Sequence, residues 1–154
     1  SWNISGWRLG YLYGDASLVG PLNNASNVFY VCSPTPLQRA LARVLMIDPA
    51  YYARLRERFT EKRRMATEVL QRLGFQIYDS GSAFYIWAHI PAGFCDAMQL
   101  NEMLISRGGV AAVPGSAFAD SNAWDGHMRL CIAREDEILQ SALAKLQDVI
   151  SQVS

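Results

Sequence analysis

The segment DPAYYARLRERFTEKRRMATEVLQRLG, residues 48–74, constrains the fold of this chain more than any other stretch. Asp48 is a good N-cap, Pro49 suits the first helical position, and Gly74 suits the position just after the last turn. Apolar residues recur between these ends at helical spacing, namely Leu55, Phe59, Ala66, Val69, Leu70 and Leu73. The pattern predicts one long amphipathic helix over about 49–73.

Shorter elements are expected on both sides of this helix. Before it, the sequence predicts a strand over 7–13, helical turns over 15–22 that stop at the asparagines of 23–27, and a helix over 35–46. After it, AFYIWAHI alternates, with Phe84, Ile86, Ala88 and Ile90 on one face and Tyr85, Trp87 and His89 on the other. Strands are also expected in GVAAVPG and HMRLCIA, and helices over 97–106 and 135–153. The inward residues of the last helix should be Ile138, Leu139, Ala142, Leu146, Val149 and Ile150.

This order of elements predicts an α+β layer, in which helices cover a small and mostly antiparallel sheet. With 154 residues, the chain is long enough for about one domain with a substantial core.

The charge balance argues against two classes of partner. Lys and Arg together number 14, as do Asp and Glu, so neither nucleic acid nor a membrane surface is expected to bind. Glutamates interrupt the most basic run, which is therefore expected to be a solvated helix face; it comprises Arg54, Arg56, Arg58, Lys62, Arg63 and Arg64. Three cysteines without C-x-x-C spacing, no leader and no long apolar stretch predict a cytoplasmic protein.

Two arginines stand out because each lies in an apolar segment predicted to be a strand. Arg129 lies in HMRLCIA and Arg8 in SGWRLGY. Burying such a charge is costly unless an opposite charge meets it, and the planar guanidinium grips a carboxylate by two parallel hydrogen bonds. An internal salt bridge or an edge strand that lets the arginine reach water would equally explain each residue, so an anionic ligand is one of three interpretations.

A series of motifs resembles the fold type I pyridoxal-phosphate aminotransferases of class I and II. SGWRLGYLYG is similar to the segment that follows the cofactor-bearing lysine in that family. The motifs TPLQ, EKRRMATEVLQRLG, SGSAFYIWAHI, GGVAAVPGSAF and MRLCIAREDEILQSALAKL follow in the expected order over nearly the whole chain. Within the family, the sequence is nearest the branch of kynurenine aminotransferases and cysteine-conjugate β-lyases.

The resemblance implies an α/β fold for the whole enzyme, pyridoxal 5'-phosphate as cofactor, and a homodimer. Residues 1–47 would complete the large cofactor domain, and 48–154 would form the small domain. Arg8 would bind the cofactor phosphate, Arg129 the α-carboxylate of the substrate, and Tyr30 would line the substrate pocket of a partner subunit. Ala119 replaces the glycine that usually follows PGSAF, which could stiffen that loop.

The resemblance also implies that no catalytic residue lies in this chain. Counting back from Arg8 by the family's spacing places the Schiff-base lysine immediately before Ser1. Lys62 and Lys145 lie on predicted amphipathic helices among charged or polar residues, where neither finds the pocket that would depress its pKa. The chain should therefore need a complementary N-terminal half, without which Trp2, Trp7, Tyr11 and Tyr13 would be exposed.

Three functions remain open from the sequence. The first is the C-terminal part of an aminotransferase that moves an amino group between an amino acid and a 2-keto acid. The second is a carbon–sulfur lyase of the same fold, and the third is a non-catalytic regulatory or association module, because fold alone does not select the reaction. No metal site is expected, and His89 and His127 are interpreted as structural.

Overall fold

The computed structural model describes residues 4–45, 48, 50–78, 81–119 and 121–153. The chain divides into two compact units, Ser1–Arg54 and Leu55–Ser154. Trp2, Met46 and Pro49, on which some sequence expectations rest, lie outside the described residues. No helix in the described ranges is both long and apolar enough to cross a membrane.

The first unit contains a short 3-10 turn (Ser5–Trp7) and two helices, α1 (Ala16–Phe29) and α2 (Thr35–Val44). The strand predicted over 7–13 is wrong: these residues form no strand, and Arg8 has a left-handed backbone with φ 55°. Helix α1 also continues through the asparagines expected to end it. Its N-cap is secured by Asp15, whose carboxylate accepts a hydrogen bond from the Ser17 N–H at 2.8 Å. Each asparagine weakens a helix by only a fraction of about 1 kcal/mol, which one good cap offsets.

Large apolar side chains of the first unit are exposed. None of its described residues is buried. Tyr11 and Tyr13, which the sequence placed among the exposed aromatics, are 89% and 85% exposed, whereas Trp7 is half-buried. The other large apolar residues exposed in this unit are Leu12, Leu18, Leu22, Val28, Phe29, Tyr30, Val31, Leu45 and Tyr52.

The long helix predicted over 49–73 is confirmed as α3 (Tyr51–Arg72), which crosses the boundary between the units. The Ala50 N–H donates a hydrogen bond to Asp48 Oδ1 at 2.9 Å, and Gly74 adopts the left-handed φ of +86° that ends the helix. The expectation of a uniformly solvated basic face is wrong at one position. Lys62 is buried together with Ala66 and Leu70 on the inner face of α3.

A four-stranded sheet follows α3, and every neighbouring pair in it is antiparallel. The strands β1 (Gln76–Tyr78), β2 (Tyr85–His89), β3 (Val113–Pro114) and β4 (His127–Cys131) lie in the order β1-β2-β4-β3. This confirms the predicted type of sheet. The sequence missed β1, because three residues at a sheet edge carry too little alternation to be recognised.

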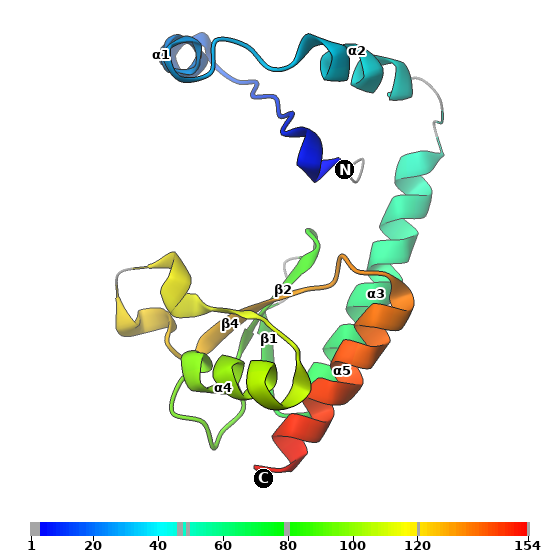
Figure 1. The fold of residues 1–154 in the computed structure, drawn as a ribbon, viewed down its shortest axis with the longest axis vertical. Helices are drawn as coiled ribbons and strands as arrows, with labels where there is room; N and C mark the ends of the chain where they lie inside the picture. Colours follow the sequence, from blue (N-terminus) through cyan, green and yellow to red (C-terminus); the bar gives the residue numbers. More distant parts are fainter. Residues whose placement is uncertain (1–3, 46–47, 49, 79–80, 120, 154) are drawn as a thin grey trace. The chain divides into compact units, whose positions relative to one another are not determined.

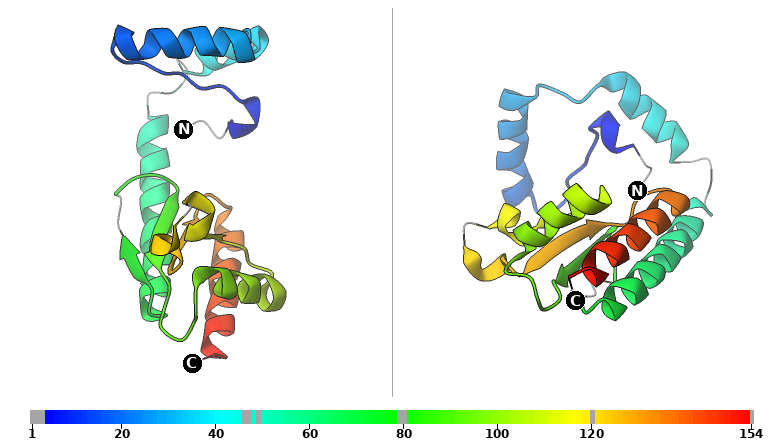
Figure 2. Two further views of the ribbon diagram at one scale, coloured as in Figure 1. Left: turned by 90° about the vertical axis from the view of Figure 1, so that its left-hand side faces the viewer. Right: turned by 60° about the horizontal axis from the view of Figure 1, so that its bottom comes forward.

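Helices α3, α4 (Ala97–Met103) and α5 (Asp136–Ser151) bury their apolar sides in one core. Helices α3 and α5 run alongside each other against the sheet, as Figures 1 and 2 show. The sheet contributes Ile86, Ala88 and Met128 to this core. One predicted inward residue of α5 is wrong, since Ile138 is 58% exposed. Leu143 is buried instead on α5, so the buried face of this helix is rotated from the expected one.

Candidate functional site

The side of the sheet that faces away from this core carries aromatic rings. Directly opposite residues on antiparallel strands share a face, and the register pairs Trp87 with Arg129 and His89 with His127. Rings from the loop between β3 and β4 complete the set, which we call the aromatic face: Tyr78, Tyr85, Trp87, His89, Phe118, Trp124 and His127. Arg129 lies on the same side of the sheet, opposite Trp87.

The guanidinium of Arg129 lies between two rings. Its central carbon is 4.1 Å from the centroid of the Tyr85 ring and 4.8 Å from that of Phe118. The side chain forms no ion pair with any carboxylate that the structure describes, and its Nε atom is buried without a hydrogen-bond partner among them. An arginine in this state retains donors that an anion can use.

No ion pair links Arg129 to a carboxylate within the described part of the chain. The edge position is wrong, because β4 lies between β2 and β3, and Arg129 has a strand partner on each side, Trp87 and Val113. The Arg129 side chain is only half-buried, so it reaches water from this interior strand as well.

Arg129 lines a hollow of about 340 Å³ together with Trp87, Phe118 and Trp124. The turn that carries Phe118 depends on a close approach at Gly115, where an added Cβ would lie 2.3 Å from the Trp124 carbonyl oxygen. Ala119, by contrast, has an extended backbone with φ −154° that any residue adopts. The replacement of the family's usual glycine there therefore imposes no strain.

His89 and His127 face each other on the aromatic face, with ring centroids 5.0 Å apart. His127 also stacks on Trp87, and its Nδ1 atom is buried without a hydrogen-bond partner among the described residues. Burial, and secondarily the neighbouring His89, lowers the pKa of His127. In the described ranges no three His, Cys, Asp or Glu side chains come together as metal ligands would.

Arg8 and Tyr30 belong to the first unit, whereas Arg129 belongs to the second. Arg8 is exposed, and its guanidinium makes no hydrogen bond or ion pair with the part of the chain that the structure describes. Its backbone N–H donates to the Ser5 carbonyl at 3.3 Å. Tyr30 caps the C-terminus of α1, with its N–H bonded to the Ser26 carbonyl and its side chain 78% exposed.

The Lys62 side chain forms an ion pair and a hydrogen bond within the second unit. Its ammonium lies 2.7 Å from Asp136 Oδ1 and also donates to the Arg134 carbonyl. The side chain is 7% exposed, and its hydrogen bonds lower the pKa of Asp136 below the usual range. Sequence periodicity missed this contact, since it depends on the start of α5 packing beside the middle of α3.

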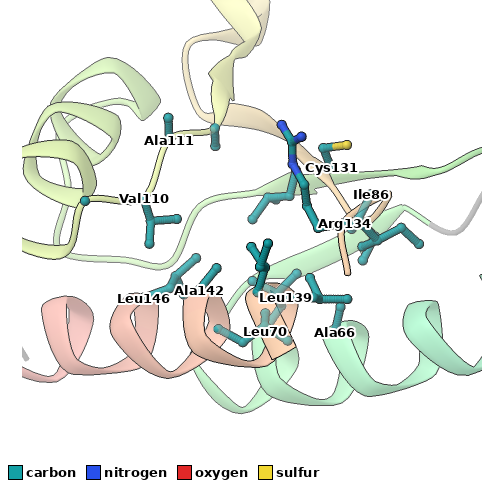
Figure 3. Close-up of a pocket in the computed structure, with 16 residues that line it drawn as sticks. Ala66, Leu70, Ile86, Val110, Ala111, Cys131, Arg134, Leu139, Ala142 and Leu146 are labelled. Carbon is teal, nitrogen blue, oxygen red and sulfur yellow. The ribbon is translucent and has the colours of Figure 1, made fainter. Parts of the chain in front are cut away.

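A second hollow, of about 260 Å³, lies between the sheet, α3 and α5. Figure 3 shows Ala66 and Leu70 of α3 and Leu139 and Leu146 of α5 along one side of it, below Val110 and Ala111. Arg134 lies at its rim, and the lining is otherwise almost entirely apolar. With no acid–base pair in its lining, this hollow offers a packing surface and no chemistry.

The model of the class I and II aminotransferase family matches residues 1–146. The chain therefore belongs to this family. It is 28% identical to LL-diaminopimelate aminotransferase of Natranaerobius thermophilus and 30% identical to that of Dehalococcoides mccartyi. These matches cover 98% and 99% of this chain but 38% of each relative, so the chain spans about two fifths of their length.

Solved structures agree with this assignment. N-succinyldiaminopimelate aminotransferase of Mycobacterium tuberculosis superposes with a TM-score of 0.84 at 29% identity, over 96% of this chain and 39% of that one. The aromatic aminotransferase of Pyrococcus horikoshii superposes with a TM-score of 0.82 at 25% identity, over 97% and 40%. The α/β fold expected from the motifs is thereby confirmed.

Proposed function

We propose that this chain acts as the C-terminal part of a pyridoxal-phosphate-dependent aminotransferase, which moves an amino group between an amino acid and a 2-keto acid. The observation that carries the proposal is the guanidinium of Arg129, which lies between two rings on an interior strand and forms no ion pair with a described carboxylate. Membership of the aminotransferase family supports it.

Arg129 would bind the α-carboxylate of the amino acid. A guanidinium offers two parallel N–H donors to a carboxylate, and a partly buried position strengthens that attraction relative to water. Because no described carboxylate competes for this arginine, the site is available to a ligand. The hollow beside it gives the rest of the substrate an aromatic wall.

Arg8 fits a role in binding the cofactor phosphate. It is exposed and unpaired among the described residues, as a phosphate-binding arginine of a separately bound cofactor must be. When bound, pyridoxal phosphate supplies the electron sink for the reaction, while the protein supplies orientation and charge complementarity. Arg8 holds the anionic end, and Arg129 orients the substrate by its carboxylate.

The complementary N-terminal portion would supply the lysine, immediately before Ser1 in the numbering of this chain. The ion pair of Lys62 with Asp136 supports this assignment, because it engages the Lys62 Nζ atom within the second unit. The exposed apolar side chains of the first unit would pack against that portion, and residues 1–47 would complete the large domain while 48–154 form the small one.

Tyr30 would line the substrate pocket of the partner subunit in a homodimer. Its exposed side chain is available for a contact between subunits. We also assign the protein to the cytoplasm, which the three free thiols Cys32, Cys95 and Cys131 support. The finer resemblance to the kynurenine aminotransferase and β-lyase branch stays a prediction.

The test is to co-express this chain with its N-terminal portion, add pyridoxal phosphate, and screen the twenty L-amino acids against 2-keto acids. We expect visible absorbance from bound cofactor and amino-group transfer. Replacing Arg129 by Lys should raise the amino-acid KM by about tenfold or more, because the charge remains and the bidentate grip is lost, and should leave the cofactor absorbance unchanged.

Three results would contradict the proposal. An unchanged KM in R129K would remove the carboxylate role. Release of a 2-keto acid and ammonia from a sulfur-substituted amino acid, without transfer to an acceptor, would instead identify a carbon–sulfur lyase. Cofactor binding without turnover of any amino acid would indicate a non-catalytic module.

A further inference from the structure

We infer that Tyr85 and Phe118 are positioning residues, which hold the plane of the Arg129 guanidinium so that its N–H edge faces the substrate carboxylate. The inference rests on the carboxylate-binding role proposed above for Arg129. It concerns two side chains that do not themselves have to touch the substrate.

A carboxylate of the protein can orient an arginine that binds a ligand. Arg129 has no such partner in the described part of the chain, and its Nε atom is buried without a hydrogen bond there. A long, flexible side chain in this condition samples several rotamers unless something else restrains it.

Two rings from different elements supply that restraint. Tyr85 comes from β2 and lies 4.1 Å from the guanidinium carbon, while Phe118 comes from the turn after β3 and lies 4.8 Å from it. Rings at these distances attract the cation through their π faces. They occupy space beside the guanidinium without consuming any of its N–H donors.

Each ring is fixed by the architecture around it. Tyr85 is paired through its backbone with Cys131 in the sheet register, and its ring packs on Phe84 at 4.4 Å between centroids. Phe118 contacts Trp87, and the turn that carries it is pressed against the Trp124 backbone at Gly115. The positions of strand β2 and of the turn after β3 therefore fix the two rings beside one guanidinium.

This arrangement separates positioning from charge neutralisation. A carboxylate partner would orient Arg129 but also compete with the substrate for its donors. The rings orient the guanidinium without pairing its charge, so the incoming carboxylate meets no competing anion from the described residues. Removing a ring should consequently weaken carboxylate binding while leaving the fold and the cofactor site in place.

The experiment uses the complete enzyme with bound cofactor and the best amino donor found in the screen of L-amino acids. Tyr85→Leu and Phe118→Leu remove one ring each, and Tyr85→Phe restores the ring without the hydroxyl. The matched control is Tyr78→Leu, which changes the same kind of side chain on the aromatic face but contacts His127 and makes no contact with Arg129.

We expect Tyr85→Leu and Phe118→Leu each to raise the amino-acid KM about three- to tenfold and to change kcat less than twofold. Tyr85→Phe and Tyr78→Leu should match the parent enzyme. Single turnover with the decarboxylated amine of the same donor should be unaffected by all four substitutions, because that amine presents no carboxylate. In an Arg129→Lys background the ring substitutions should lose their effect, since an ammonium has no plane to orient.

Three outcomes would overturn the inference. If R129K raises the KM while both leucine variants behave as Tyr78→Leu does, the carboxylate role stands and only the positioning role fails. If the leucine variants slow the amine and the amino acid equally, the rings act on the fold alone. If R129K itself leaves the KM unchanged, the carboxylate role fails, and the positioning role fails with it. Phe118 is half exposed, so its substitution keeps the test decisive even if Tyr85→Leu does not fold.

Discussion

At the scale of single residues, several polar side chains of the second unit have aromatic rings as their neighbours. Arg129 lies between Tyr85 and Phe118, and His127 stacks on Trp87 beside His89. Rings shield polar groups from water without offering them strong hydrogen bonds, so these groups keep their donors and acceptors. The free donors of Arg129 suit an anionic ligand, whereas burial among rings makes protonation of His127 costly.

The depressed pKa of His127 predicts a pH dependence of stability. Its pKa is lowered from 6.5 in the folded chain, so below pH 6.5 the unfolded chain binds the proton first. The stability that neutral His127 contributes is thus fully present above pH 6.5 and declines as the pH falls below it. Replacing His127 by Phe keeps a ring against Trp87 and removes the titration.

The measurement is the free energy of unfolding in urea for both proteins between pH about 5 and about 7.5. As the pH falls, the free energy of unfolding of the parent chain should decrease more than that of His127→Phe. Parallel stability curves for the two proteins would show that His127 is not the group responsible.

At the scale of elements, three ion pairs join α3 to the start of α5. Lys62 lies 2.7 Å from Asp136, and Arg58 lies 3.2 Å from Glu135 and 3.8 Å from Asp136. The first pair is asymmetric, since Lys62 is 7% exposed whereas Asp136 is 59% exposed. Losing the aspartate leaves an ammonium beside the core, and losing the lysine leaves a carboxylate in water.

This asymmetry predicts that Asp136→Asn destabilises the chain more than Lys62→Met does. An unpaired buried charge is costly, whereas Met fills the same volume and Asp136 stays solvated beside Arg58. The midpoint of urea unfolding for the two variants is the measurement. A lower midpoint for Lys62→Met than for Asp136→Asn would contradict this account of the pair.

At the scale of the whole molecule, the two units differ in how much they bury. The core lies in Leu55–Ser154, whereas no described residue of Ser1–Arg54 is buried and many of its apolar side chains are exposed. Exposed apolar surface of this extent marks an interaction site or causes aggregation. The second unit therefore holds the stability of the isolated chain.

We expect residues 48–154, expressed alone with the Asp48 cap retained, to be monomeric and to unfold cooperatively. The isolated chain 1–154 should instead self-associate and bind a hydrophobic dye more strongly. Size-exclusion chromatography with light scattering and dye fluorescence compare the two directly. A monomeric, non-binding 1–154 chain would show that the first unit covers its own apolar surface.

The sequence alone determined the features that depend on neighbours along the chain. The caps at Asp48 and Gly74 and the apolar stripe between them predicted α3, and alternation predicted β2 with Tyr85, Trp87 and His89 on one face. The order of the motifs along the chain indicated the aminotransferase family. Local hydrogen bonds and side-chain spacing carry this information, so no knowledge of the fold is required to read it.

Only the tertiary structure decided which distant residues meet. The β2–β4 register brings Trp87 opposite Arg129 and His89 opposite His127, and the packing of α5 on α3 buries Lys62. The short strand predicted around Arg8 failed for the same reason: bulky residues become a strand only where a partner strand is available. Pairing and burial depend on contacts far apart in the chain, which no local pattern specifies.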